Sequence, residues 1–267
     1  MSAAGHQLAI LAGSAAFTTA ATAWWRHRGV PGGHRRWTRT NHAGQNVSLL
    51  EGPSLVLATS AALAYSDPTG AVLCLAGGSV GAWDDLHPDA ARKGLAGHLG
   101  ALTRGEVSPG ALKVLGLGSS AMFVVWTNQR DDVDAGWADL VLGSVLVAGT
   151  ANLINLFDLR PGRALKVAAL SSLALWHRRD PAVAAVLGAS LASLPLDLAG
   201  ESMMGDTGAN PLGALLGLGA MRSLNRSERL VATGAVVGLT LLSERVSFSA
   251  VIASTPGLRE LDQWGRA

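Results

Sequence analysis

The stretch "GWADLVLGSVLVAGTANLINLF" (residues 136–157) decides the fold class, because it is almost wholly apolar and reaches the roughly 20 residues that a helix needs to cross a bilayer. Other apolar stretches follow the same pattern, although several are shorter than a full crossing. They lie at 7–25, 52–66, 69–83, 111–126, 164–177, 181–199, 211–224 and 229–246.

The composition agrees with a membrane protein. Of the 267 residues, 49% are hydrophobic and only 15% are charged, against about 25% in soluble domains. The sequence therefore predicts an all-α integral membrane protein, a polytopic bundle of about nine transmembrane helices. The single cysteine, Cys74, excludes a disulfide framework and a cysteine-rich metal site. The net charge of +2 indicates no nucleic-acid partner.

The basic residues predict the topology. Most of the 21 Lys and Arg residues lie in the loops that follow the first, third, fifth, seventh and ninth apolar stretches. By the positive-inside rule these loops are cytoplasmic, so the N-terminus is expected outside and the C-terminus inside. Residues 1–246 are expected to form the transmembrane domain with cytoplasmic site loops. Residues 247–267 form an amphipathic cytoplasmic tail, for which membrane association and docking both stay open.

Four polar clusters fall on these same loops, at 39–46, 83–98, 151–166 and 200–211. They can therefore converge on one face. Their acids are Asp84, Asp85, Asp158 and Asp206. Carboxylates suit Mg²⁺, a hard ion that keeps waters for substrate phosphates, and neighbouring basic residues can neutralise those phosphates.

Local signals predict that the helix near residue 211 begins with Asn210 as its N-cap and Pro211 at its first position. Its positive end would then face the same cleft. Glu201 is interpreted as a solvated or salt-bridged acid at a helix end. The acidic run at 131–134 is interpreted as solvated charge.

Simpler interpretations of the polar clusters stay open. The Asp84–Asp85 pair fits solvated acids at a helix end, and Asp158 fits an ion pair with Arg163. Asn152 and Asn155 fit amides that pack between helices.

Four stretches carry a resemblance to a known family. They are "RTNHAGQNVSLLEGP" (39–53), "GAWDDL" (81–86) with "KGLAGH" (93–98), "ANLINLFD" (151–158) and "MMGDTGANPLG" (203–213). Their order and spacing resemble the polyprenyl-phosphate N-acetylhexosamine-1-phosphate transferases, a superfamily that includes phospho-N-acetylmuramoyl-pentapeptide transferase.

The resemblance implies transfer of a sugar-1-phosphate from a UDP-sugar to polyprenyl phosphate at a bacterial plasma membrane, with Mg²⁺ as cofactor and UMP as product. Asp84 or Asp85 would act as general base, and Asp206 would bind the metal. A homodimer stays open. The implied site residues are Asp84, Asp85 and Asp158 for catalysis, His42, Lys93, Asn152, Asn155 and Arg163 for substrate binding, and Asp206 for the metal.

Departures from the family pattern leave other functions open. Pro161 stands where the third motif usually has a second acid, and the His-rich loop near the family's C-terminus is missing. A non-catalytic relative that binds polyprenyl phosphate or nucleotide as a scaffold is the alternative. A transporter or flippase is a third class, but it predicts charges buried within the spans, whereas these acids gather at helix ends.

Overall fold

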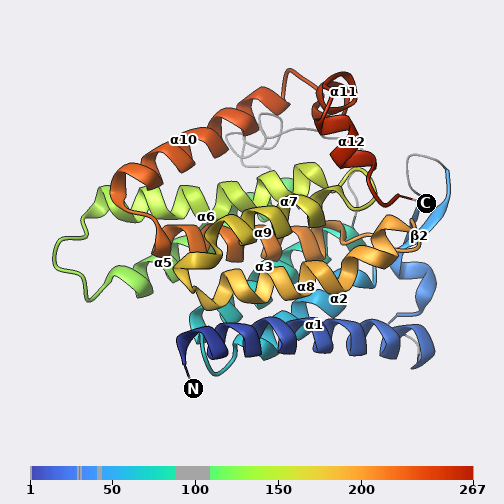
Figure 1. Ribbon diagram of the computed structural model, residues 1–267, viewed down its shortest axis with the longest axis horizontal. Coiled ribbons are helices and arrows are strands. Elements are labelled where there is room, and N and C mark those ends of the chain that lie inside the picture. Colours follow the sequence, from blue (N-terminus) through green and yellow to red (C-terminus); the bar gives the residue numbers. More distant parts are fainter. Residues whose placement is uncertain (1, 29, 31, 41–43, 88–108, 267) are drawn as a thin grey trace.

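The computed structural model describes residues 2–28, 30, 32–40, 44–87 and 109–266. Most of them form helices that run along the long axis of the molecule (Figure 1). The helices are α1 (Ala3–Arg28), α2 (Glu51–Leu63), α3 (Pro68–Leu86), α5 (Pro109–Gln129), α6 (Trp137–Phe157), α7 (Arg163–Leu175), α8 (Pro181–Leu198), α9 (Gly205–Ser223), α10 (Arg226–Ser243), α11 (Phe248–Ser254) and α12 (Leu258–Gln263).

The predicted helical fold is confirmed, and every predicted apolar stretch lies largely on a helix. Within the described residues, three helices are long and apolar enough to cross a membrane: α1, α6 and α8. The pair α10 and α11, bent by 98°, makes a fourth candidate. Helices α2 and α7 have only 13 residues each and are too short to cross a bilayer. The structure therefore supports three to four spans by length and composition.

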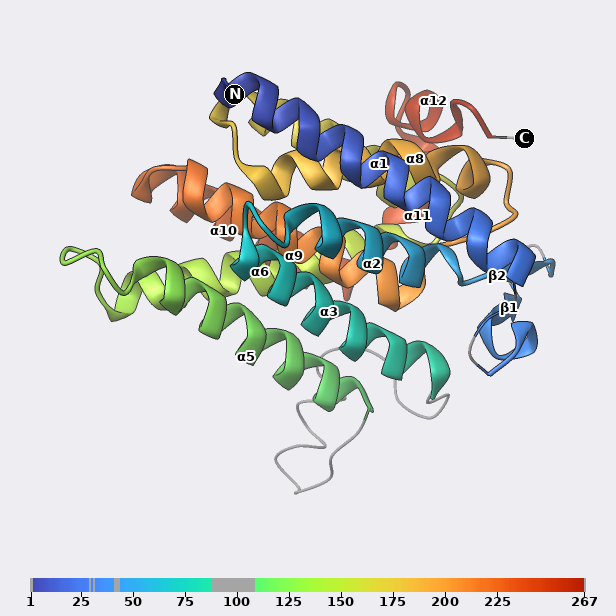
Figure 2. The ribbon, with the colours of Figure 1, turned by 90° about the horizontal axis from the view of Figure 1, so that it is seen from below.

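Helix α9 forms the centre of the bundle. It packs against α2, α3, α6, α7 and α8, and nearly all of its residues are buried. Small residues allow this close packing: a Cβ on Gly81 of α3 would collide with the carbonyl oxygen of Asp206. Seen from below, α1, α2, α3 and α5 lie side by side in chain order (Figure 2). The close approach at Gly81 brings the end of α3 against the start of α9.

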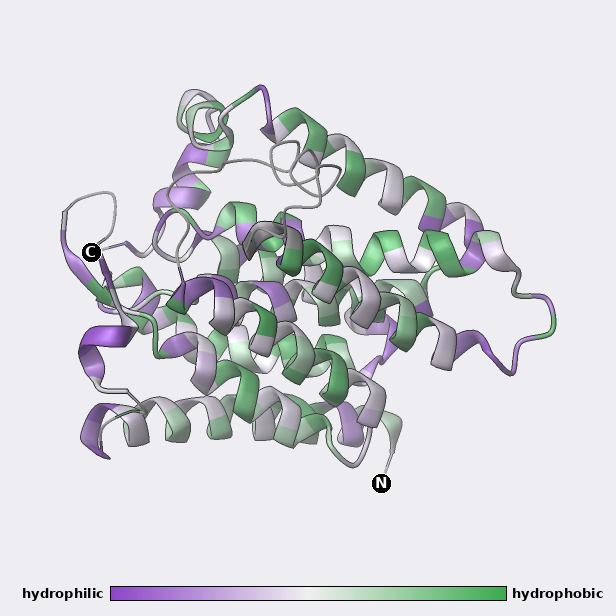
Figure 3. Cartoon of the chain, turned by 180° about the vertical axis from the view of Figure 1, so that it is seen from behind, coloured by the Kyte–Doolittle hydropathy of each residue, from purple (hydrophilic) through white to green (hydrophobic). Residues whose placement is uncertain are grey.

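Hydrophilic residues gather mainly toward the two ends of the bundle, while its middle is hydrophobic to neutral (Figure 3). At one end, strands β1 (Thr38–Thr40) and β2 (Asn46–Ser48) form an antiparallel hairpin that pairs Thr38 with Ser48. The hairpin is fixed to the α8–α9 connection, because the N–H of Met203 donates to the carbonyl oxygen of Ser48 at 2.9 Å. This end carries the candidate site.

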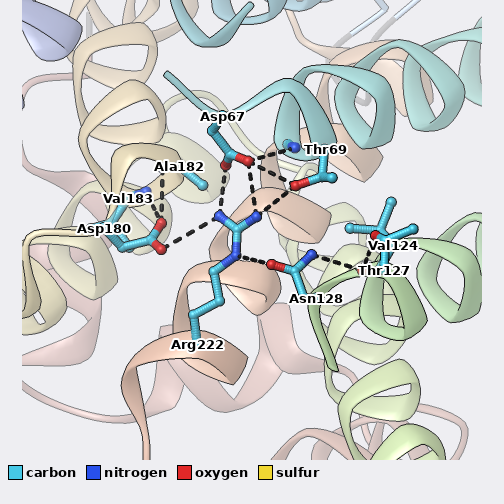
Figure 4. Close-up of polar contacts among 10 residues, drawn as sticks. Asp67, Thr69, Val124, Thr127, Asn128, Asp180, Ala182, Val183 and Arg222 are labelled. Carbon is cyan, nitrogen blue, oxygen red and sulfur yellow. Dashed lines mark hydrogen bonds and ion pairs between the residues drawn. The ribbon is translucent and has the colours of Figure 1, made fainter. Parts of the chain in front are cut away.

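At the opposite end of the bundle, one arginine side chain links several helices (Figure 4). Arg222 of α9 makes a bidentate contact with Asp67 at 2.7 and 2.9 Å and lies 3.5 Å from Asp180. Both acids are N-caps followed by proline, Asp67 for α3 and Asp180 for α8. The Nε of Arg222 also donates to Asn128 of α5 at 2.8 Å. Four helices therefore meet at a single guanidinium group.

Candidate functional site

The site is built around the first turn of α9, whose backbone N–H groups have no partner within the helix. Asp158, just after α6, accepts from the N–H of Gly205 at 2.9 Å. Asp85 of α3 accepts from the N–H groups of Asp206 and Thr207 at 3.2 and 2.9 Å, and from the Thr207 hydroxyl at 2.7 Å. Two acids from other helices thus cap α9, where the helix dipole favours negative charge.

This capping corrects the predicted start of the helix. Helix α9 begins at Gly205, so Asn210 and Pro211 lie inside it rather than at its N-terminus. Gly205 has a positive φ of 59°, and a Cβ there would lie 2.8 Å from a carboxylate oxygen of Asp85. Only a glycine admits this backbone beside the capping acid. The local sequence gives no sign of caps supplied by distant segments.

Lys113 of α5 joins the other two acids of the site. Its ammonium group forms a close ion pair with Asp206 and lies 3.7 Å from Oδ2 of Asp84. The Asp84 carboxyl group and the Asn155 side chain also lie close enough to the Asp206 carboxylate to interact with its charge. Asp84 and Asp206 therefore share one polar environment. This role of Lys113 was not predicted from the sequence.

A cleft of about 440 Å³ opens beside these residues. It is lined by the hairpin, the end of α3, the turn between α6 and α7, α8, and the connection into α9. Its cationic side chains are Arg39 and Arg160. Its acids are Asp85, Asp158, Asp197 and Asp206, and Asn155 adds an amide. The cleft thus combines groups suited to phosphates with groups suited to a cation.

Two buried acids near the cleft were not predicted. Asp197 of α8 is 2% exposed and lines the cleft. Glu51 at the start of α2 is 1% exposed and accepts a hydrogen bond from the Ser202 hydroxyl. Burial raises the pKa of Asp158 well above its usual range, and the negative charge of Asp197 raises it further. Both acids sit in apolar helices, where residue spacing gives no sign of a shared cleft.

The remaining predicted site residues divide into three groups. Asn155 lines the cleft, whereas Asn152, one turn earlier on α6, is not among the described lining residues. Arg163 is turned to the C-terminal tail, where its guanidinium group contacts Asp262 at 2.7 and 3.0 Å. The proposed Asp158–Arg163 ion pair is therefore wrong, since each side chain has another partner. His42 and Lys93 lie outside the described residues.

Two interpretations of isolated acids are confirmed. Glu201 makes a salt bridge with Arg26 at 2.9 Å. Asp131, Asp132 and Asp134 are all exposed. Neither feature belongs to the cleft.

The acids around the start of α9 form a donor set that fits Mg²⁺ only in part. Within the described residues, no group of three or more His, Cys, Asp or Glu side chains is arranged to hold a metal ion. Magnesium, however, is commonly bound by one or two carboxylates, with waters and substrate phosphates completing its shell. Asp84 and Asp206, with the nearby Asn155 side chain, match that smaller set. The Lys113 ammonium lies against the same two carboxylates, as a cation there would.

Compared with known proteins, the chain matches no protein-family model and no curated protein sequence.

Proposed function

We propose that the chain is a bacterial plasma-membrane protein with about nine transmembrane helices that transfers a sugar-1-phosphate from a UDP-sugar to polyprenyl phosphate and releases UMP. The observation that carries the proposal is the convergence of Asp84, Asp85 and Asp206 beside Lys113, with Asp85 and Asp206 lining the cleft. These acids come from two helices whose sequence motifs resemble the transferase family. A cytoplasmic position for this end is supported by the basic residues of its loops.

The contacts suggest different duties for the paired acids. Both oxygens of Asp85 accept hydrogen bonds from α9, so Asp85 suits a positioning role. Asp84 makes none of these capping bonds, and its side chain is 27% exposed. Asp84 is therefore the better candidate for contact with the reacting groups, where it would hold Mg²⁺ and so position the acceptor phosphate. Asp158 holds the N–H of Gly205 and so fixes the start of α9.

The reaction exchanges one phosphoanhydride bond for another. An oxygen of polyprenyl phosphate forms a bond to the β-phosphorus of the UDP-sugar, the bond between this phosphorus and the bridging oxygen breaks, and UMP leaves with that oxygen. Arg39 and Arg160 would face the diphosphate. Asp84, Asp206 and Asn155 would hold Mg²⁺, which when bound supplies neutralisation of phosphate charge.

A second candidate is the non-catalytic relative that binds polyprenyl phosphate or nucleotide as a scaffold of envelope assembly. One observation favours it: Lys113 already neutralises Asp84 and Asp206. A lysine that stays in this place would compete with Mg²⁺ for the two carboxylates. The two candidates differ in whether a metal displaces that ammonium group.

A UMP-release assay tests the proposal. Purified protein in detergent receives polyprenyl phosphate, Mg²⁺ and a panel of UDP-sugars. We expect metal-dependent UMP release with one donor and a loss of at least 100-fold in Asp206→Asn. Asp131→Asn, a change in the exposed loop, is the matched control and should keep wild-type activity. Folded protein that binds polyprenyl phosphate but releases no UMP from any donor would support the scaffold instead.

A further inference from the structure

Asp197 holds an unusual position for a carboxylate. It is the second-last residue of α8, it is 2% exposed, and it lines the cleft. Its Oδ2 atom is buried and has no hydrogen-bond partner among the described residues. A buried carboxylate oxygen without a donor is costly, so its retention calls for a partner that the chain itself does not supply.

The contacts around Asp197 leave that oxygen free. The backbone N–H of Gly162, just before α7, lies close enough to the carboxylate to stabilise its charge. Lys166 and Arg266 lie within electrostatic range. However, Lys166 donates to three tail carbonyls at 2.6–3.0 Å, and Arg266 donates to the carbonyl of Pro161 and to Asp262. These surroundings therefore leave the buried Oδ2 atom of Asp197 without a donor among the described residues.

The charge of the cleft indicates what the free oxygen meets. A carboxylate repels phosphate, and the two arginines that line the same cleft, Arg39 and Arg160, are better partners for it. Asp197 must then face an uncharged part of a bound molecule that carries N–H or O–H donors. The base, the ribose and the sugar of a nucleotide-sugar all carry such donors.

We infer that Asp197 is a specificity-determining residue whose Oδ2 accepts a hydrogen bond from a hydroxyl or amide N–H of the nucleotide-sugar, outside its diphosphate. This inference rests on the proposed function, because it takes the ligand class from it. A site built to receive such a donor discriminates strongly against analogues that lack the donor.

The test is a double-mutant cycle between residue 197 and the donors of the ligand. Binding of the UDP-sugar is measured by calorimetry for the wild type and for Asp197→Asn, a change that keeps the shape of the side chain. The same titrations use N3-methyl, 2′-deoxy and sugar-deoxy analogues. Ser193→Ala is the matched control, since Ser193 is buried one turn earlier on α8 and does not line the cleft.

We expect Asp197→Asn to weaken UDP-sugar binding about 10- to 100-fold. We also expect the wild type to bind one analogue more weakly than the UDP-sugar by a similar factor, whereas the variant should bind that analogue and the UDP-sugar with nearly equal affinity. Ser193→Ala should leave both affinities unchanged. If the variant does not fold, the analogue series in the wild type still decides, because unchanged affinity for every analogue overturns the inference.

The outcomes separate this inference from the proposed function. Normal UDP-sugar binding without coupling to residue 197 would overturn the role of Asp197 alone. A folded wild-type protein that binds no UDP-sugar would overturn both.

Discussion

At the scale of single residues, two adjacent acids have acquired different environments. Asp85 is turned to the backbone of α9, and Asp84 is turned to Lys113. Neighbouring residues on a helix point about 100° apart, so one helix end can supply a structural cap and a reactive carboxylate at once. The third acid, Asp206 of α9, pairs with the ammonium group of Lys113 from α5. Since Lys113 also lies near Asp84 of α3, this contact links three helices.

Lys113→Gln tests this arrangement. Without divalent ions, the variant should lose about 1–3 kcal/mol of stability, because the carboxylates of Asp84 and Asp206 keep their mutual repulsion and lose the ammonium group. Added Mg²⁺ should raise the Tm of the variant by more than that of the wild type, since no lysine competes for the carboxylates. Thermal unfolding with and without Mg²⁺ measures both effects.

Arg130→Gln provides the control for Lys113→Gln, because Arg130 pairs with Asp131 in an exposed contact. Its Tm should change little, with or without the ion. An equal Mg²⁺ effect in all three proteins would contradict a metal site at Asp84 and Asp206.

At the scale of elements, the tail is a docking segment. Lys166 of α7 donates to the carbonyls of Leu261, Asp262 and Trp264. Arg163 holds Asp262, and the rings of Phe157 and Phe248 stack at 5.4 Å. A mainly apolar cavity of about 300 Å³ lies beneath, between α7, α10, α11 and α12. The tail thus packs against the turn between α6 and α7, which lines the cleft.

Arg163→Lys should release the tail, because a lysine keeps the charge but cannot make the bidentate contact with Asp262. Trypsin cleavage at Arg259, in α12, should become about tenfold faster, as expected when one charge-assisted contact no longer opposes local unfolding. Mass spectrometry of timed digests locates and times the cut. Arg178→Lys, in a surface pair with Glu228, should digest like the wild type. Unchanged cleavage in Arg163→Lys would show that the Lys166 hydrogen bonds and the apolar contacts hold the tail without the bidentate contact of Arg163.

At the scale of the whole molecule, the two ends of the bundle are fastened by the same charge pattern, acidic side chains around one basic side chain. Acids surround one lysine at the cleft end, and two N-cap acids hold one arginine at the far end. Burial raises the pKa of Asp67, but the hydrogen bonds and charge of Arg222 outweigh it, so the pKa lies below its usual range. The ionised form of Asp67 therefore stabilises the fold.

This charge pattern predicts a pH dependence. Asp67→Asn should lower stability at pH 5–7 by about 1–3 kcal/mol. The difference from the wild type should shrink below about pH 4, because a depressed folded-state pKa gives stability that is lost as Asp67 becomes protonated. Unfolding curves from pH 7 to 3.5 measure it, with Asp131→Asn as control. A constant difference across this range would show that the ionisation of Asp67 is not what holds the network.

The sequence by itself determined the helices and the acids of the site. Long apolar stretches are a local property of the chain, so their positions and the placing of Asp84, Asp158 and Asp206 at helix ends could be predicted. Tertiary structure alone decided the start of α9, the ion pair of Lys113, the burial of Asp197 and the partner of Arg163. Each of these depends on a contact between segments that are far apart in the chain. The spacing of residues within one segment does not predict which charged group of another segment will contact it.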